Sequence, residues 1–224
     1  MPPEDYRRLA ASLETVPPEF KRTIYKPGER TRHVCFPADG FFSMLAVLAN
    51  GDMVEVATVG REGVIGAPAA VADTSEPSFT MVQAEMQTCY RLPVAAFRRE
   101  MDRRGAFASL ITKYIHAPVG VIMQGTACNA VHTVEQRLAR WLLMAHDRVG
   151  KDSFPLTQEF LAMMLGAARP TVTIVAGTLQ RAGLINYKRG QLTVEDRDGL
   201  EKASCERYAA TTNLITQVTL AAAS

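Results

Sequence analysis

Cysteine and histidine are the residues with the widest chemistry in this 224-residue chain, so their spacing comes first. The four cysteines lie far apart, at Cys35, Cys89, Cys128 and Cys205. None has the short C-x-x-C spacing that zinc ribbons and locally clustered iron–sulfur sites use. Cysteines so spaced in a cytoplasmic chain are mostly reduced, buried thiols. The sequence therefore predicts no metal site and no cofactor, and a redox-sensing thiol is the alternative.

A cysteine beside a histidine can also form a thiol enzyme's nucleophile, here Cys89 or Cys128 with His116 or His132. Such pairs are common by chance. No phosphate loop, metal motif or nucleophile elbow accompanies them in the sequence. We therefore expect no catalytic residues and no enzyme activity, and other parts of the chain must carry the function.

Two short helices joined by a tight glycine-containing turn are predicted between residues 157 and 182. Thr157 can cap the first helix, and Gly166 can end it. Pro170 falls in the first turn of the second helix, where its missing amide hydrogen costs nothing. This succession is typical of a helix-turn-helix unit.

A β-hairpin with a basic tip is predicted directly after the second helix. Residues 184–187 and 191–194 flank Lys188-Arg189-Gly190, as two strands flank a turn. Such a hairpin is the wing of a winged helix. Helix-turn-helix patterns also arise in ordinary bundles, but the pattern followed by a wing at this spacing predicts DNA binding.

The outer face of the second helix carries the side chains that we expect to read DNA. Arg169 can contact a guanine edge through two hydrogen bonds, and Ile174 can pack against a thymine methyl group. Gly177 lets the backbone approach DNA closely, and other polar side chains suit phosphate contacts. The predicted DNA-binding residues are Thr157, Gln158, Arg169, Pro170, Thr171, Thr173, Ile174, Gly177, Arg181, Lys188 and Arg189.

The first half of the chain alternates short apolar runs with turn signals, which predicts an antiparallel β-roll. Asn50-Gly51 between two apolar runs is the strongest hairpin signal, because a type I′ turn needs positive φ at both central residues. From about residue 106 to 132 the apolar period becomes helical. Pro118 and Gly120 are expected to kink or restart that helix.

A new helix is predicted to begin at Thr133, because Thr133 and Gln136 fit the capping box. The break before it suggests a domain boundary. The expected fold is α+β: a β-roll sensor domain over 1–104, a dimerisation helix over 105–132, and a winged helix-turn-helix over 133–224. Burial of the long helix against its own roll is the alternative to an interface between subunits.

Composition limits the class of protein. The net charge is +2 and 47% of the residues are hydrophobic, which excludes intrinsic disorder and a histone-like basic binder. A monomer with so little charge would bind DNA weakly, so we expect a homodimer reading two half-sites about 34 Å apart. No run of 18 apolar residues and no apolar signal core occur, so we expect a cytoplasmic protein without membrane contact.

The chain resembles the Crp/Fnr family of bacterial transcription regulators. The resemblance rests on residues 134–143, 156–179 and 204–208, and on residues 54–66 of the first half. It implies a cyclic-nucleotide-binding-like jelly roll, a long dimerisation helix and a winged helix-turn-helix that reads palindromic operators. The implied partners are double-stranded DNA, a second copy of the chain and RNA polymerase.

The chain departs from the cyclic-AMP-binding members at the residues that hold the nucleotide. Those members carry Gly-Glu and then Arg-Ser, where this chain has Gly66-Ala67 and then Ser78-Phe79. A buried anion without a paired cation is costly, so cyclic AMP is not expected to bind in the usual mode. The effector stays unassigned, and the candidate pocket residues are Arg61, Glu62, Gly66, Ser78, Ile122 and Met123.

For Arg61 and Glu62 a surface ion pair is the other interpretation. The recognition helix departs from the family too, because only the first arginine of its reading set survives, as Arg169. The family's known operator therefore cannot be carried over. A ligand- or redox-sensing module with weak or lost DNA binding is the alternative function.

Overall fold

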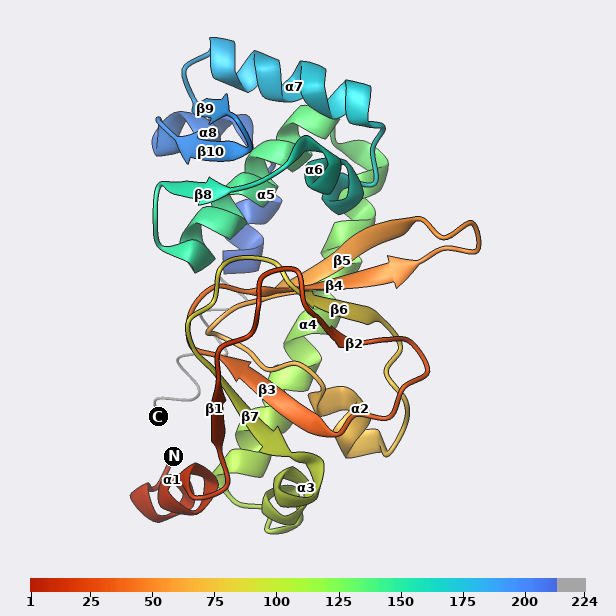
Figure 1. Cartoon of the computed structure of the whole chain (residues 1–224), viewed down its shortest axis with the longest axis vertical. Coiled ribbons are helices and arrows are strands. Elements are labelled where there is room, and N and C mark those ends of the chain that lie inside the picture. The colour runs from red at the N-terminus through yellow and green to blue at the C-terminus, as the bar shows by residue number, and fades with distance from the viewer. Residues whose placement is uncertain (213–224) are drawn as a thin grey trace.

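The computed structural model describes residues 1–212. A β-rich half and a mostly helical half stand at opposite ends of the molecule, and one long helix runs beside the first half (Figure 1). The helices are α1 (Pro3–Ala10), α2 (Ala67–Ala72), α3 (Val94–Asp102), α4 (Ala106–Val131), α5 (Val134–Val149), α6 (Gln158–Leu165), α7 (Arg169–Arg181) and α8 (Arg197–Ala203).

The strands of the first half form two antiparallel sheets, as expected for a roll. One has the order β1-β7-β3 and the other β2-β6-β4-β5. A third sheet, β8-β10-β9, belongs to the second half. The strands are β1 (Glu14–Val16), β2 (Thr23–Tyr25), β3 (His33–Pro37), β4 (Phe42–Val47), β5 (Met53–Val59), β6 (Phe79–Val82), β7 (Cys89–Pro93), β8 (Ser153–Pro155), β9 (Ile185–Lys188) and β10 (Gln191–Val194).

The hairpin predicted at Asn50-Gly51 forms between β4 and β5, but its turn is not the expected type. Gly51 has φ +89°, whereas Asn50 is not among the residues with positive φ. The Asn50 side chain instead accepts a hydrogen bond from the Asp52 amide at 3.0 Å. The loop joins the last strand pair, Val47 and Met53, and is longer than a two-residue turn.

A kink or a restart was expected at Pro118 and Gly120; the helix predicted around residues 106–132 is continuous, so it does not restart there. Pro118 lies inside α4, which spans 26 residues. A proline removes one backbone hydrogen bond, and the turns on either side of it hold the helix together. Within residues 1–212, α4 is the one unbroken helix that is long and apolar enough to span a membrane. Only 22% of its most apolar 18-residue stretch is buried inside the molecule.

The capping box predicted at Thr133 is present. The Thr133 hydroxyl accepts a hydrogen bond from the Gln136 amide, and the Gln136 side chain accepts one from the Thr133 amide. His132 ends α4 in extended conformation, so two helices meet at His132–Thr133. We call this junction the hinge.

The largest apolar core joins the two halves of the molecule. Phe41 of the roll packs edge-to-face on Trp141 of α5, with ring centroids 6.3 Å apart. The Trp141 indole donates a hydrogen bond of 2.7 Å to Glu55 of β5. Burial raises the pKa of Glu55 to about 7, although hydrogen bonds from Ser43 and Trp141 favour its charged form. The two halves are thus packed together through buried side chains.

Candidate DNA interface and sensor cavity

The two helices predicted between residues 157 and 182 form a helix-turn-helix. Thr157 caps α6 by accepting a hydrogen bond from the Phe160 amide, and Gly166 ends it with φ +56°. α6 and α7 are bent by 106° relative to each other. Helix-turn-helix units cross at about 90–120°. The angle therefore suits a second helix projecting from the molecule, as Figure 1 shows for α7.

One face of α7 is buried and the opposite face is exposed. Val172, Ala176 and Leu179 contribute to the core, whereas Ile174 is 67% exposed. Most of the predicted DNA-binding residues lie on exposed surface of the helix-turn-helix, namely Thr157, Arg169, Pro170, Thr171, Thr173, Ile174 and Arg181. Gln158 and Gly177 are half-buried. The structure thus leaves most of these side chains exposed on the helix-turn-helix.

Two polar contacts hold side chains of this surface in place. The Thr173 hydroxyl donates a hydrogen bond of 2.8 Å to Gln158 of α6, which links the two helices. An Arg181 guanidinium nitrogen donates to the Thr178 hydroxyl at 3.1 Å. A DNA-facing surface with pre-positioned side chains loses less conformational freedom on binding.

The wing predicted at residues 184–194 is a hairpin of β9 and β10. Its two turn residues, Arg189 and Gly190, have φ +53° and +78°. This is the positive-φ pair that a type I′ turn needs. The Tyr187 amide donates to Gln180 of α7 at 2.9 Å, so the wing is attached beside the recognition helix. Lys188 and Arg189 are exposed at its tip.

The predicted effector-pocket residues do not form one cavity. Glu62 pairs with Arg148 of α5 at 2.7 Å, which replaces the surface ion pair expected with Arg61. Ile122 lines a cavity at the hinge side of β5. Met123 is 68% exposed on α4. These positions were matched through the family resemblance and not through contacts, so their role in binding an effector stays a prediction.

Gly66 and Ser78 are the positions that the family resemblance matches to the phosphate site, and a buried acid lies near Gly66. Gly66 has φ +82° and packs against Tyr25 and Thr31. Burial raises the pKa of the Glu76 carboxyl, and the hydrogen bond that the Thr31 hydroxyl donates to it opposes this rise. The Ser78 hydroxyl is buried without a hydrogen-bond partner among residues 1–212. The Gly66 position therefore has a buried acid, Glu76, beside the Thr31 side chain that packs on it.

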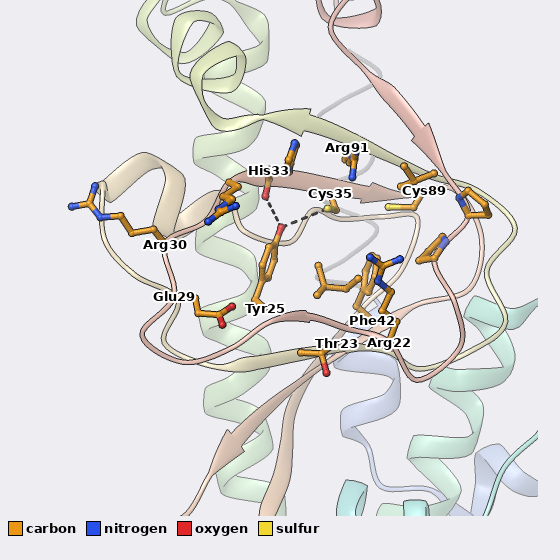
Figure 2. A pocket seen from close by; sticks show the side chains of 15 residues that line it. Arg22, Thr23, Tyr25, Glu29, Arg30, His33, Cys35, Phe42, Cys89 and Arg91 are labelled. Carbon is orange, nitrogen blue, oxygen red and sulfur yellow. Dashed lines mark hydrogen bonds between the residues drawn. The ribbon is translucent and has the colours of Figure 1, made fainter.

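A second cavity in the roll, of about 510 Å³, was not predicted from the sequence (Figure 2). Tyr25 extends across it and donates a hydrogen bond of 2.7 Å to the His33 carbonyl. Cys35 and Cys89 lie on its wall, and the Cys89 thiol lowers the pKa of Cys35 through a hydrogen bond. Four arginines also line it: Arg22, Arg30, Arg32 and Arg91. These come from separate loops and strands, so no sequence spacing marks them.

A group at the hinge was also missed. Cys128, His132 and Cys205 are distant in sequence, yet their potential ligand atoms all lie within 4.8 Å of one another. A search for C-x-x-C spacing compares only cysteines that are close in sequence. It therefore could not find a group that the fold brings together from distant parts of the chain.

Comparison with protein families gives a match in each half. A model for the cyclic nucleotide-binding domain matches residues 19–104. A model for the Crp-like helix-turn-helix domain matches residues 136–203. Comparison with curated protein sequences gave no match.

Solved structures with the same fold are regulators. A Crp/Fnr-family transcriptional regulator from Eubacterium rectale is 17% identical, with a TM-score of 0.71 over 91% of this chain and 94% of its own. FixK2 from Bradyrhizobium japonicum is 15% identical, with a TM-score of 0.72 over 86% and 98%. The c-di-GMP-responsive regulator CLP from Xanthomonas campestris is 13% identical, with a TM-score of 0.69 over 85% and 98%.

At these sequence identities the solved structures establish the fold alone. The two family matches establish which domains the chain contains and in which order they follow. With a cyclic nucleotide-binding domain followed by a Crp-like helix-turn-helix, the chain belongs to the Crp/Fnr family of transcription regulators.

Proposed function

We propose that this regulator is a homodimer in the cytoplasm that binds a palindromic operator and acts as a transcription factor, not as an enzyme. The exposed face of α7 beside the basic wing carries the proposal. Contact with RNA polymerase is the expected route from DNA binding to transcription. Activation or repression depends on where the operator lies.

In this proposal α7 enters the major groove and the wing contacts the backbone. Arg169 reaches a guanine edge and Ile174 a thymine methyl group, which specify sequence. Lys188, Arg189 and Thr157 contact phosphates, which set the register of the protein on the duplex. Their exposure leaves them accessible to DNA.

The exposed apolar surface of α4 supports dimerisation. Val119, Met123 and Val131 are 50%, 68% and 74% exposed along this helix. Exposed apolar side chains spread over a 26-residue helix are typical of a surface that a protein partner covers. Packing α4 against its copy would place two α7 helices on successive major grooves, about 34 Å apart.

The charge around Gly66 argues against cyclic AMP in the family's usual mode. A buried carboxyl at Glu76 lies close to the position where the family supplies a cation. Phosphate next to a buried acid would be repelled. Because CLP is c-di-GMP responsive, calorimetric titration should include c-di-GMP beside cyclic AMP. Cyclic AMP binding that is lost in Ser78→Ala would contradict this part of the proposal.

DNA binding is tested by fluorescence anisotropy or gel shift on DNA from the chain's own promoter region, over a series of salt concentrations. We expect a sequence-dependent shift that weakens with salt. The double variant Arg169→Ala with Lys188→Ala should lose about 2–4 kcal/mol, roughly 30- to 1,000-fold in Kd. Arg99→Ala is the matched control, because Arg99 is an exposed arginine of α3, in the other half of the chain.

The outcomes separate the two functional hypotheses. Unchanged affinity in the double variant would contradict the assignment of α7 and the wing. No sequence-dependent shift with any tested effector would favour a ligand- or redox-sensing module that has lost DNA binding. Sedimentation at several concentrations tests the homodimer, and a monomer at operator-binding concentrations would overturn that part.

A further inference from the structure

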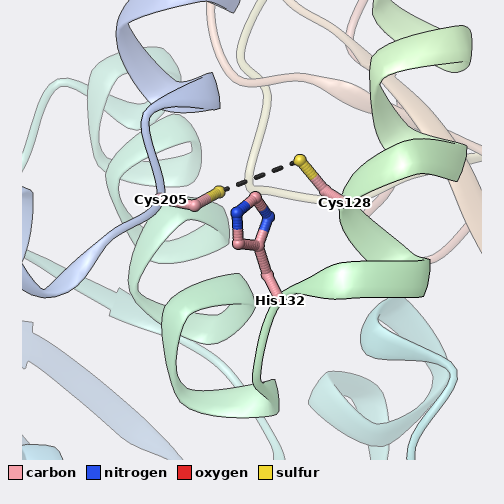
Figure 3. A group of neighbouring side chains, drawn as sticks. All are labelled: Cys128, His132 and Cys205. Atoms are coloured by element: carbon pink, nitrogen blue, oxygen red, sulfur yellow. Dashed lines mark hydrogen bonds between the residues drawn. The ribbon is translucent and has the colours of Figure 1, made fainter.

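Three side chains with metal-binding atoms meet at the hinge (Figure 3). Cys128 lies in the last turn of α4, and His132 ends that helix. Cys205 follows α8, in the DNA-binding half. The three come from two separate parts of the chain, and both cysteines are buried at 3% exposure. The fold therefore builds an enclosed group of two thiols and one imidazole.

The distances suit a tetrahedral ion. Cys128 Sγ and Cys205 Sγ are 4.0 Å apart. Tetrahedral zinc with Zn–S bonds of about 2.3 Å holds two sulfurs roughly 3.8 Å apart. A disulfide needs a sulfur–sulfur distance of about 2.05 Å, so it requires a larger movement. Figure 3 shows the His132 ring beside the two sulfurs.

The hydrogen bonding of His132 matches that of a metal ligand. Its Nδ1 is buried and has no hydrogen-bond partner within residues 1–212. Its Nε2 lies 3.3 Å from a Glu206 carboxylate oxygen. Metal-binding histidines commonly donate their second ring N–H to a carboxylate, which fixes the ring and its tautomer. A buried nitrogen without a partner is otherwise costly.

The surrounding charge is compatible with a thiolate-bound ion. Arg140 and Arg207 are buried close to the two cysteines. Two thiolates balance a divalent ion, so the complex adds no net charge beside the arginines. Among residues 1–212, Arg140 and Arg207 each have guanidinium N–H groups without a partner, and these are then available to the sulfurs.

We propose that Cys128, His132 and Cys205 bind a thiophilic divalent ion of the Zn²⁺ class, with water in the fourth position. Two sulfurs and an imidazole select such an ion over Mg²⁺ or Ca²⁺. Two S–H protons pass to solvent when the sulfurs bind. The ion joins the end of α4 to the segment after α8. Its effect on DNA binding rests on the proposed function, whereas metal binding itself does not.

The test uses the full reduced chain, stripped with a chelator and titrated with Co²⁺ as a spectroscopic probe. We expect one ion per chain, with a thiolate-to-cobalt charge-transfer band and strong visible bands of tetrahedral cobalt. Zn²⁺ should abolish these bands. Cys128→Ser, Cys205→Ser and His132→Gln should each weaken Co²⁺ binding about 10- to 100-fold or more. The double variant Cys35→Ser with Cys89→Ser is the matched control and should bind as the parent does.

Several outcomes would overturn the proposal. These are the absence of thiolate bands, bands that persist in Cys128→Ser, or bands lost only in the Cys35 and Cys89 control. A Cys128–Cys205 disulfide that forms in air, in a protein that binds no Co²⁺ when reduced, would show a redox pair instead. Thermal unfolding of each variant checks folding. A normal operator shift without Co²⁺ binding would leave the proposed DNA function intact.

Discussion

The arginines on the surface of α7 are exposed, whereas those at the hinge are buried. Arg169 and Arg181 are exposed, where an unpaired cation costs little and remains available to DNA. Arg140 and Arg207 are only 9% and 4% exposed, and each has guanidinium nitrogens without a hydrogen-bond partner within residues 1–212. A buried unpaired charge costs several kcal/mol. The exposed group thus suits an external partner, whereas the buried group implies compensation inside the molecule.

This contrast predicts separate consequences for mutation. Changes at the buried junction should alter stability and the position of the two halves. Changes on α7 should alter DNA affinity and leave stability nearly unchanged. If the buried junction and α7 are independent, a variant at the junction leaves the intrinsic DNA contacts of α7 unchanged. A variant on α7 then leaves the free energy of unfolding unchanged.

Trp141→Ala should have the largest effect. Trp141 is 4% exposed, packs on Phe41 and donates a hydrogen bond to Glu55. Its removal leaves a cavity and one Glu55 carboxyl oxygen without its hydrogen bond, so we expect a loss of about 3–5 kcal/mol in the free energy of unfolding. Chemical denaturation measures it, with Trp141→Phe as the control that keeps most of the packing. A loss below about 1 kcal/mol would mean that the two halves are not held together here.

Glu55→Gln should remove a pH dependence of stability. The raised pKa of Glu55, about 7 against 4.5, means that the folded state binds its proton more tightly than the unfolded state. Stability from this group is therefore present below pH 4.5 and falls as the pH rises through about 7. The expected difference is about 2–3 kcal/mol between pH 4.5 and pH 8.

The measurement is denaturation of both proteins at a series of pH values. The side-chain carbonyl of the introduced glutamine would still accept the Trp141 hydrogen bond, so the variant isolates the charge. Glu85→Gln is the control, because Glu85 is an exposed carboxyl of the same half. Parallel pH curves for parent and Glu55→Gln would contradict the assignment.

The features predicted correctly from sequence depend on residues close together in the chain. The helix-turn-helix, its Thr157 cap, the Thr133 capping box and the wing all follow from spacings of a few residues. Continuity of α4 through Pro118 was not predictable in the same way, because the neighbouring turns outweigh one lost hydrogen bond.

The sensor half shows where local patterns fail. Glu62 was expected to form a surface ion pair with Arg61, yet it forms one with Arg148, 86 residues away. The cavity around Tyr25 and the group of Cys128 with Cys205 also require the folded chain. Sites closed by long-range contacts have no sequence spacing to identify them, because the spacing depends on the loops between their elements.

Ile174→Ala should have the smallest effect and gives the sharpest test of the exposed surface. Ile174 is 67% exposed, so its truncation should change the free energy of unfolding by less than about 0.5 kcal/mol. If Ile174 packs on a thymine methyl group, operator affinity should fall by about 1 kcal/mol, roughly five-fold. Anisotropy titration on the operator, and on one with that thymine replaced by uracil, measures the contact.

Val71→Ala is the matched control, because Val71 is an exposed apolar residue of α2, in the other half of the chain. We expect the parent to distinguish thymine from uracil and Ile174→Ala to lose that distinction, since only the methyl group differs between the two bases. Equal affinity of parent and variant, while Arg169→Ala weakens binding, would mean that only the start of α7 meets the bases. A large loss of stability in Ile174→Ala would instead show that the surface of α7 is not independent of the core.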